Sequence, residues 1–172
     1  MNHHLTDLLD HPKVLETRDH IHHNIAKHDH LLRTVKYSAK IARVLRADAR
    51  TCLRAALIHD IDSRYGTLTT HGAIAARWAA EYGESEAVQL AIISHMYPFG
   101  PPPRTREAWV LVLADKVASL GDLRQFMRGL LNGSSLAARR RLLQTDPFVR
   151  HRRSQPRMVR QRLRLRRRAR QP

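Results

Sequence analysis

Histidine and aspartate residues recur along this sequence at positions where they could share a cation. The segment AALIHDID at 55–62 places His59 and Asp60 together at the end of an apolar run that otherwise suits a protein core. Burying a carboxylate without compensation costs several kcal/mol, so the apolar run alone does not explain this pair. Four other segments each carry one such residue where a predicted helix starts, ends or buries its apolar face: His30, His71, His95 and Asp115.

Asp115 gives a second reason to expect a metal ion. It interrupts EAWVLVLADKVASL, which is nearly all apolar before it, so its charge needs a cation or strong hydrogen-bond donors. Imidazole nitrogen and carboxylate oxygen together suit Mn, Fe, Co, Ni or Zn, with Mg less natural. The lone Cys52 argues against a thiolate zinc cluster. We therefore expect one or two divalent metal ions.

The elements that must position these residues are predicted to be helices nearly throughout. Apolar residues recur at spacings of three and four, and alternating β-branched runs are absent. Helices are predicted over 25–46, from an Asp48 cap to His59, from about His71 to Gly83, from a Ser85 cap to His95, and from about Glu107. A loop follows the His59–Asp60 pair, four prolines break MYPFGPPPR, and beyond Asp122 two weaker helical stretches flank Asn132-Gly133.

Charge divides the chain into a body and a tail. Basic residues outnumber acidic residues by 31 to 15, but eleven arginines and no acid lie within 150–172. We expect one domain over 1–149, with its core at 20–122, and an Arg-rich tail at 150–172 that is disordered or a frayed helix. No apolar run approaches the roughly 18 residues needed to span a bilayer. With the lone cysteine and no signal-peptide pattern, this predicts a cytoplasmic protein; the oligomeric state stays open.

The order of these residues resembles the HD-domain metal-dependent phosphohydrolases over about residues 20–122. The resemblance is carried by HDHLLRTVKYSAKIA, AALIHDID, THGAIAARWA, IISHMYPFGPPPR and VLVLADKVASL, the last three being especially similar to small stand-alone bacterial HD proteins. It implies a compact all-α helical bundle. The first metal would be held by His30, His59, Asp60 and Asp115. In relatives with the additional histidines the aspartate of the pair bridges to a second metal, here also held by His71 and His95.

Two histidines, His28 and His30, are candidates for the first metal ligand. Helix phase places His28 near the centre of the apolar face around Val35, whereas the resemblance selects His30. The residues that follow His30 at offsets typical of the family are Leu32, Ser38, Ile41 and Ala42. We prefer His30. The other histidines of this region are expected in solvated or capping roles, with extra metal affinity as the alternative: His20, His22 and His23.

The resemblance implies hydrolysis of a phosphomonoester or phosphodiester, such as a nucleotide, by metal-activated water with Asp60 at its centre. Arg64 and Lys116 are the candidates for holding the substrate phosphate. Arg64 is preferred because a loop can aim a bidentate guanidinium into a cleft. Asp62 is expected to support a ligand histidine or to relay a proton.

The tail supports a rival prediction from another class of function. The protein would then be a non-catalytic helical binding module, tethered to nucleic acid by residues 150–172. The arginines of the tail predict non-specific, salt-dependent contact with a phosphate backbone. Interleaved aromatic residues are missing, which argues against base stacking.

Overall fold

The computed structural model describes residues 2–22, 24–147 and 149, so the predicted tail lies outside the described part of the chain. Within this part the protein is all-α, as predicted, with eight α-helices and one two-stranded hairpin. The α-helices are α1 (Thr6–Leu9), α2 (Pro12–Leu15), α3 (Lys27–Leu45), α4 (Ala49–Ile58), α5 (His71–Glu81), α6 (Glu86–Ser94), α7 (Arg106–Leu131) and α8 (Ser134–Thr145). The hairpin pairs β1 (Ile21–His22) with β2 (Ile25–Ala26), and short 3₁₀ turns cover Asn2–His4, Glu16–Asp19 and Ser63–Tyr65.

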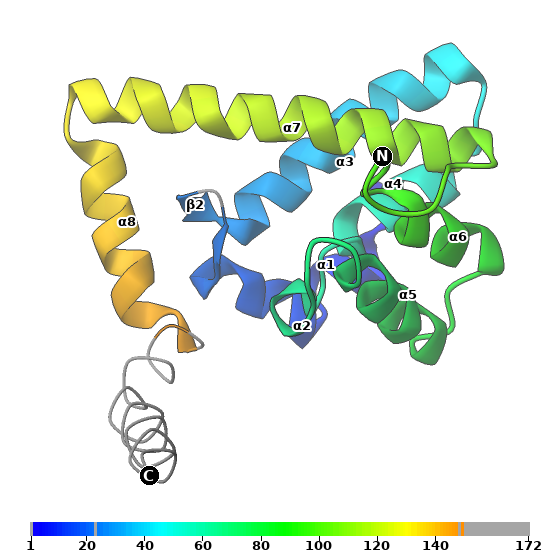
Figure 1. Cartoon of the computed structure of the whole chain (residues 1–172), viewed down its shortest axis with the longest axis horizontal. Coiled ribbons are helices and arrows are strands. Elements are labelled where there is room, and N and C mark those ends of the chain that lie inside the picture. Colours follow the sequence, from blue (N-terminus) through cyan, green and yellow to red (C-terminus); the bar gives the residue numbers. More distant parts are fainter. Residues whose placement is uncertain (1, 23, 148, 150–172) are drawn as a thin grey trace, which may run out of the picture.

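Five helices build the body of the molecule. The long helix α7 crosses one side, α3 and α4 pack against it, and α5 and α6 form the adjoining layer (Figure 1). The core between them is made of fully buried apolar side chains, the largest of which include Leu31, Leu57, Ile58, Ile92 and Leu111. This packing closes the interior around the ends of α4, α5 and α6.

Local signals place several helix ends where the sequence predicts them. The Asp48 carboxylate accepts a hydrogen bond from the backbone N–H of Thr51 at 2.7 Å, which caps α4. Helix α5 begins at His71, and α6 ends at Ser94, directly before His95. The predicted histidines therefore do lie at helix ends, where the chain can aim a side chain away from the helix axis.

The two helical stretches expected beyond Asp122 are both helical and flank Asn132-Gly133, but the first is the continuation of α7, which runs without interruption to Leu131. Asp122 lies two turns after Asp115 on the same face of the helix and is fully buried. Gly121 lets Arg33 pass close to the helix, since a Cβ there would lie 2.9 Å from the Arg33 Cδ atom. Both residues thus make inward contacts in the middle of a continuous helix.

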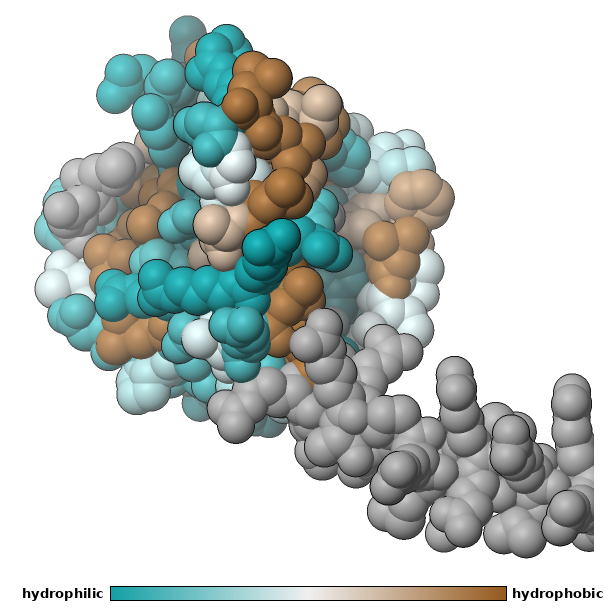
Figure 2. All heavy atoms as spheres, turned by 90° about the vertical axis from the view of Figure 1, so that its left-hand side faces the viewer, coloured by the Kyte–Doolittle hydropathy of each residue, from teal (hydrophilic) through white to brown (hydrophobic). Residues whose placement is uncertain are grey.

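Helix α8 folds back from the far end of α7 toward the hairpin (Figure 1). The surface at this end mixes hydrophilic and hydrophobic areas (Figure 2). Leucine side chains on the outward face of α7 are exposed to solvent. Leu120 is 67% exposed and Leu131 is 91% exposed. Among the helices described, none is both long enough and apolar enough to cross a membrane.

Candidate metal centre

The structure brings the six predicted metal ligands together where five helices meet. They are His30 in the first turn of α3, His59 and Asp60 in the turn after α4, His71 at the start of α5, His95 just after α6, and Asp115 in the middle of α7. All are buried except Asp115, which is partly buried. Residues separated by 85 positions in the sequence thus share one interior site.

One group of ligands surrounds Asp115. Its Oδ1 atom lies 3.2 Å from Nε2 of His30 and 3.7 Å from Nε2 of His59. One ligand atom from each of the three residues lies within 4.8 Å of the others. A metal ion bound at about 2.0–2.2 Å needs ligand atoms at such separations, so these three can hold one cation.

A second group surrounds Asp60. Its Oδ1 atom lies 3.4 Å from Nε2 of His71 and 3.8 Å from Nε2 of His95. Asp60 and His95 also form a three-residue ligand group with His59. Because His59 belongs to both groups, the two halves of the centre adjoin each other.

Each of the four ligand histidines has its Nδ1 atom fixed by an acceptor. The acceptors are the Asp122 carboxylate for His30 at 2.6 Å, and backbone carbonyls for His59 (Ala56, 3.0 Å), His71 (Thr67, 2.8 Å) and His95 (Ile92, 2.7 Å). A carbonyl or carboxylate oxygen can only accept, so each Nδ1 carries the proton. In the neutral rings Nε2 then presents a lone pair to the centre, which is the arrangement that a metal ligand requires.

The lone pairs of two of these histidines face each other. The Nε2 atoms of His71 and His95 are 2.9 Å apart, and with both Nδ1 atoms protonated neither neutral ring has a hydrogen to donate to the other. Asp60 Oδ1, beside them, is buried and has no hydrogen-bond partner among the residues described. Three buried acceptors this close together repel one another unless a proton or a cation lies between them. The donor set therefore fits a divalent metal.

The charges of the site suit metal binding at neutral pH. Burial raises the pKa of Asp60, but the neighbouring His59, His22 and Lys27 outweigh this and hold it well below its usual range. The pKa of Asp115 is likewise low, because the effect of burial is outweighed by His30 and His59, which carry a positive charge when protonated. Burial, with the nearby His59, lowers the pKa of His95 to about 4. Both carboxylates are thus ionised while His95 stays neutral.

The low pKa of His95 predicts that the metal-free protein loses stability in mild acid. The unfolded state takes up a proton near pH 6.5, whereas folded His95 does so only near pH 4. Lowering the pH from 7 to about 4.5 therefore favours the unfolded state, by about 2 kcal/mol from this residue. Urea unfolding in EDTA at both pH values measures the loss. His95→Gln is expected to reduce it, and an equal pH dependence in the variant would contradict the assignment.

Two comparisons with known proteins bear on this site. Residues 28–120 match the HD domain family, and they include all six residues of the cluster. The chain belongs to the HD domain family. It is also 38% identical over 73 residues to Ribonuclease Y from Cutibacterium acnes, a match that covers 39% of this chain and 13% of that protein. No solved structure matches the chain.

HD domains are typically metal-dependent phosphohydrolases, so the resemblance seen in the sequence is confirmed at the level of the family. The pair that gives the family its name is His59–Asp60. Of the two candidates for the first HD ligand, the structure places His30 in the cluster, whereas His28 faces Thr17 at 3.3 Å on another side of α3. The apolar pattern around Val35 favoured His28 because it takes account of apolar residues only. The inward face of α3 also includes the buried polar residues Thr34 and Ser38.

Asp122, which the sequence does not single out, lies directly behind the candidate ligand His30. Its carboxylate accepts the Nδ1 hydrogen of His30 and forms an ion pair with Arg33. The side chain is fully buried. The signal in the sequence is the spacing of seven from Asp115, which puts both carboxylates on one face of α7.

Two further residues near the HD pair were not predicted to be part of the site. Lys27 is buried, and its ammonium group donates to the Asp60 carbonyl at 3.2 Å and to Ser63 Oγ at 2.6 Å. Burial lowers the pKa of Lys27, although Asp60 acts in the opposite direction. His22 has its Nδ1 atom 3.6 Å from Asp60 Oδ2. His23 lies outside the described residues.

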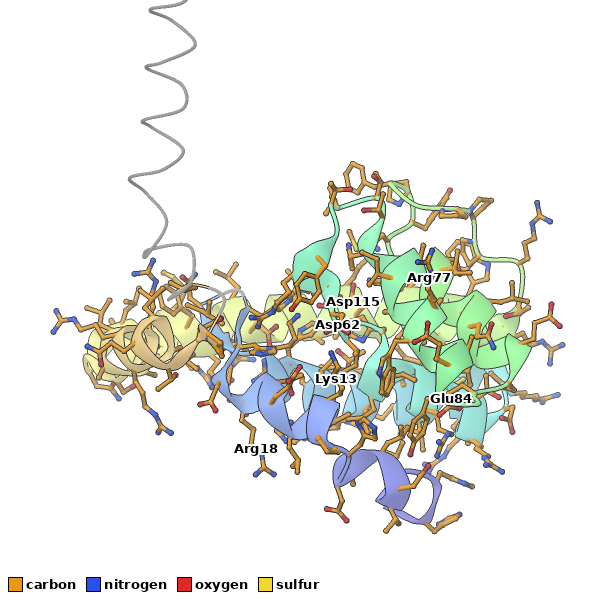
Figure 3. All side chains as sticks on the ribbon, turned by 90° about the horizontal axis from the view of Figure 1, so that it is seen from below. Lys13, Arg18, Asp62, Arg77, Glu84 and Asp115 are labelled. Carbon is orange, nitrogen blue, oxygen red and sulfur yellow. The ribbon has the colours of Figure 1, made fainter. Side chains whose placement is uncertain are left out.

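Asp62 and Arg64 have other partners than those expected. Both oxygens of Asp62 accept from Lys13 at 2.9 Å, and Figure 3 labels this pair. Its carboxylate is thus held by Lys13 rather than by a ligand histidine. The Arg64 guanidinium donates to Asp146 at 3.1 Å. Asp146 draws Arg64 toward the end of α8, so the preference for Arg64 as the phosphate-binding residue finds no support in its position.

A cavity of about 240 Å³ opens onto the HD ligands. Its floor contains His59, Asp60, His71, His95 and Asp115, and its wall includes Lys116, Leu68, Met96 and the segment Tyr97–Phe99. The Lys116 ammonium group donates to the Tyr97 carbonyl at 2.7 Å. Of the two phosphate-binding candidates, Lys116 is the one that lines this cavity.

Proposed function

We propose that this protein hydrolyses a phosphate ester, a phosphomonoester or phosphodiester of a nucleotide, with one or two divalent metal ions bound by His30, His59, Asp60, His71, His95 and Asp115. The main support is the arrangement at Asp60, where two histidine lone pairs converge on a buried carboxylate oxygen that has no hydrogen-bond donor in the described part of the chain. When bound, divalent ions supply an activated water and compensate charge on the phosphoryl oxygens. Family membership supports the same reaction class.

The residues of the chain have distinct parts in this proposal. The buried carboxylates and neutral imidazoles hold the cations, and the backbone carbonyls and Asp122 keep each histidine in the required tautomer. Lys116 at the wall of the cavity provides a positive charge for the non-bridging oxygens of the substrate. Asp62 and Arg64 would act at a distance, by fixing the loop after the HD pair.

The shape of the cavity supports an organic phosphate of moderate size. About 240 Å³ is below the range of typical ligand pockets, so the phosphate and an adjoining sugar would enter while the rest of the substrate stays outside. The mouth carries Tyr97 and Phe99, which are 37% and 64% exposed. Exposed aromatic rings beside a phosphate site favour a nucleobase or an aryl group, which can stack on them.

Metal removal and replacement test the proposed reaction. We expect EDTA-treated protein to lose at least about 100-fold in hydrolysis of p-nitrophenyl phosphate, bis(p-nitrophenyl) phosphate or nucleotides, and to recover it with one of Mn, Fe, Co, Ni, Zn or Mg. Short RNA is included because the relative in Cutibacterium acnes is named as a ribonuclease. Metal binding without hydrolysis of any substrate would contradict the proposal and leave the helical binding module. Nucleic-acid contact through residues 150–172 and a cytoplasmic location stay predictions.

A further inference from the structure

His22 lies at the edge of the metal centre although no HD ligand was expected there. Its Nδ1 atom is 3.6 Å from Asp60 Oδ2, and its ring centroid is 4.7 Å from that of His30. One ligand atom each from His22, His30 and Asp60 lies within 4.8 Å of the others. The side chain is 21% exposed and lines the cavity. The ligand atoms of the other two candidate groups lie within the same distance of one another.

The two oxygens of Asp60 face different histidines. Oδ1 is directed at His71 and His95, whereas Oδ2 is directed at His22. Imidazole nitrogen on each side of a shared carboxylate suits a pair of first-row divalent ions. His22 supplies such a ligand on the Oδ2 side, close to His30.

The hairpin that carries His22 cannot hold this position by itself. Each strand has two residues, and the pairs are Ile21 with Ala26 and His22 with Ile25. An isolated two-stranded hairpin is marginally stable at best in water. The orientation of His22 must therefore depend on contacts with the rest of the protein.

Asp146, directly after α8, supplies such a contact. Its Oδ2 atom accepts from the backbone N–H of Ile21 at 2.9 Å, and its Oδ1 atom accepts from Arg64 at 3.1 Å. Asp146 is only 2% exposed. The carboxylate thus joins the residue before His22 to the loop that follows the HD pair. Helix α8 packs against both strands of the hairpin (Figure 1).

We propose that His22 is an additional ligand of the metal centre and that Asp146 is the positioning residue that holds it there. Both lie outside residues 28–120, the part of the chain that matches the HD family. The inference rests on the proposed metal centre and deepens it. Helix α8 then has a function, which is to present Asp146 to the hairpin.

Cobalt binding tests this proposal without reference to hydrolysis. Full-length protein is freed of metal and titrated with Co²⁺, and the affinity and the visible absorption of the bound ion are recorded. We expect His22→Gln to weaken binding about 10-fold and to change the absorption band, because a nitrogen ligand is lost. Asp146→Asn is expected to weaken binding by about 3- to 10-fold, with Asp146→Glu, which keeps the charge, closer to wild type.

The double variant separates positioning from a general loss of structure. If Asp146 acts through His22, Asp146→Asn weakens binding in the wild-type background and has little effect in the His22→Gln background. Asp7→Asn is the matched control, since Asp7 also accepts from an arginine, Arg54, but far from the centre. It should leave the Co²⁺ spectrum unchanged. Circular dichroism verifies that each variant is folded.

The possible results distinguish the metal-ligand proposal from the proposed hydrolysis. An unchanged Co²⁺ affinity and spectrum in His22→Gln overturns the ligand assignment, even if the wild type hydrolyses phosphate esters. An equal effect of Asp146→Asn in both backgrounds overturns the positioning role. If Co²⁺ binding changes as expected but no metal form hydrolyses a substrate, the proposed function fails and the ligand assignment stands. A wild type that binds no Co²⁺ overturns the ligand assignment, whereas the proposed hydrolysis is overturned only if no metal ion supports activity.

Discussion

Asp60→Asn is expected to lower kcat/KM for metal-dependent hydrolysis by about 10³-fold or more, while the protein stays folded. Asp60 contributes to both halves of the centre, because its two oxygens face different histidines. Removing its charge leaves the imidazoles without the buried anion that draws cations to them. Asparagine has nearly the same shape, so packing around the HD turn is preserved.

Stability should fall together with activity. The Asp60 side chain is 4% exposed, and even without metal His59, His22 and Lys27 hold its pKa well below the usual range, so the folded protein stabilises this charge. In EDTA at neutral pH, Asp60→Asn is therefore expected to unfold at a lower urea concentration than the wild type. Enzyme assays with added metal and urea unfolding without it measure the two effects on the same preparation.

Glu84→Gln provides the matched control for Asp60→Asn. Glu84 is another buried carboxylate, but its partner is Arg54, at 2.6 Å, on the side of α4 away from the cavity. This change should cost stability, because it leaves the buried guanidinium partly unpaired, and it should preserve kcat/KM. Retention of more than a tenth of the wild-type activity by Asp60→Asn would refute the central role of Asp60.

The sequence predicts the helices well because each helix end has a local cause. A capping residue such as Asp48 or Ser85 acts within three residues of itself, so its effect is visible in the sequence. The start of α5 at His71 has no side-chain cap, so its prediction rests on the apolar pattern that follows it. Charge inside an apolar run likewise singles out Asp60 and Asp115, since burial makes such a charge costly wherever the chain folds.

The supporting residues were missed because their partners are distant in the sequence. Asp122 meets His30 across 92 positions, and Asp146 meets Ile21 across 125. Neither lies in a motif that marks it as part of the site. His22 was hidden among neighbouring histidines, and only the hairpin that turns it toward Asp60 distinguishes it from them.

Asp122→Asn is expected to weaken metal binding by about 10- to 100-fold, the second-largest effect among these predictions. The Asp122 carboxylate accepts the Nδ1 hydrogen of His30 at 2.6 Å and so keeps the Nε2 lone pair directed at Asp115. An amide can accept this hydrogen only weakly, and it can also donate to Nδ1. When the amide donates to Nδ1, the imidazole proton lies on Nε2 instead, and His30 can then no longer bind the metal. The ion pair with Arg33 is lost in the same change.

Saturation with metal distinguishes this effect from a loss of catalytic groups. Because Asp122 does not itself touch the cavity, kcat at saturating metal should fall much less than the affinity for the metal. Titration calorimetry with Mn²⁺ or Zn²⁺ gives the affinity, and assays over a range of metal concentrations give kcat. Asp29→Asn, an exposed carboxylate next to His30 on α3, is the control and should behave as wild type. Equal metal affinity in Asp122→Asn and wild type would show that His30 keeps its tautomer without this carboxylate.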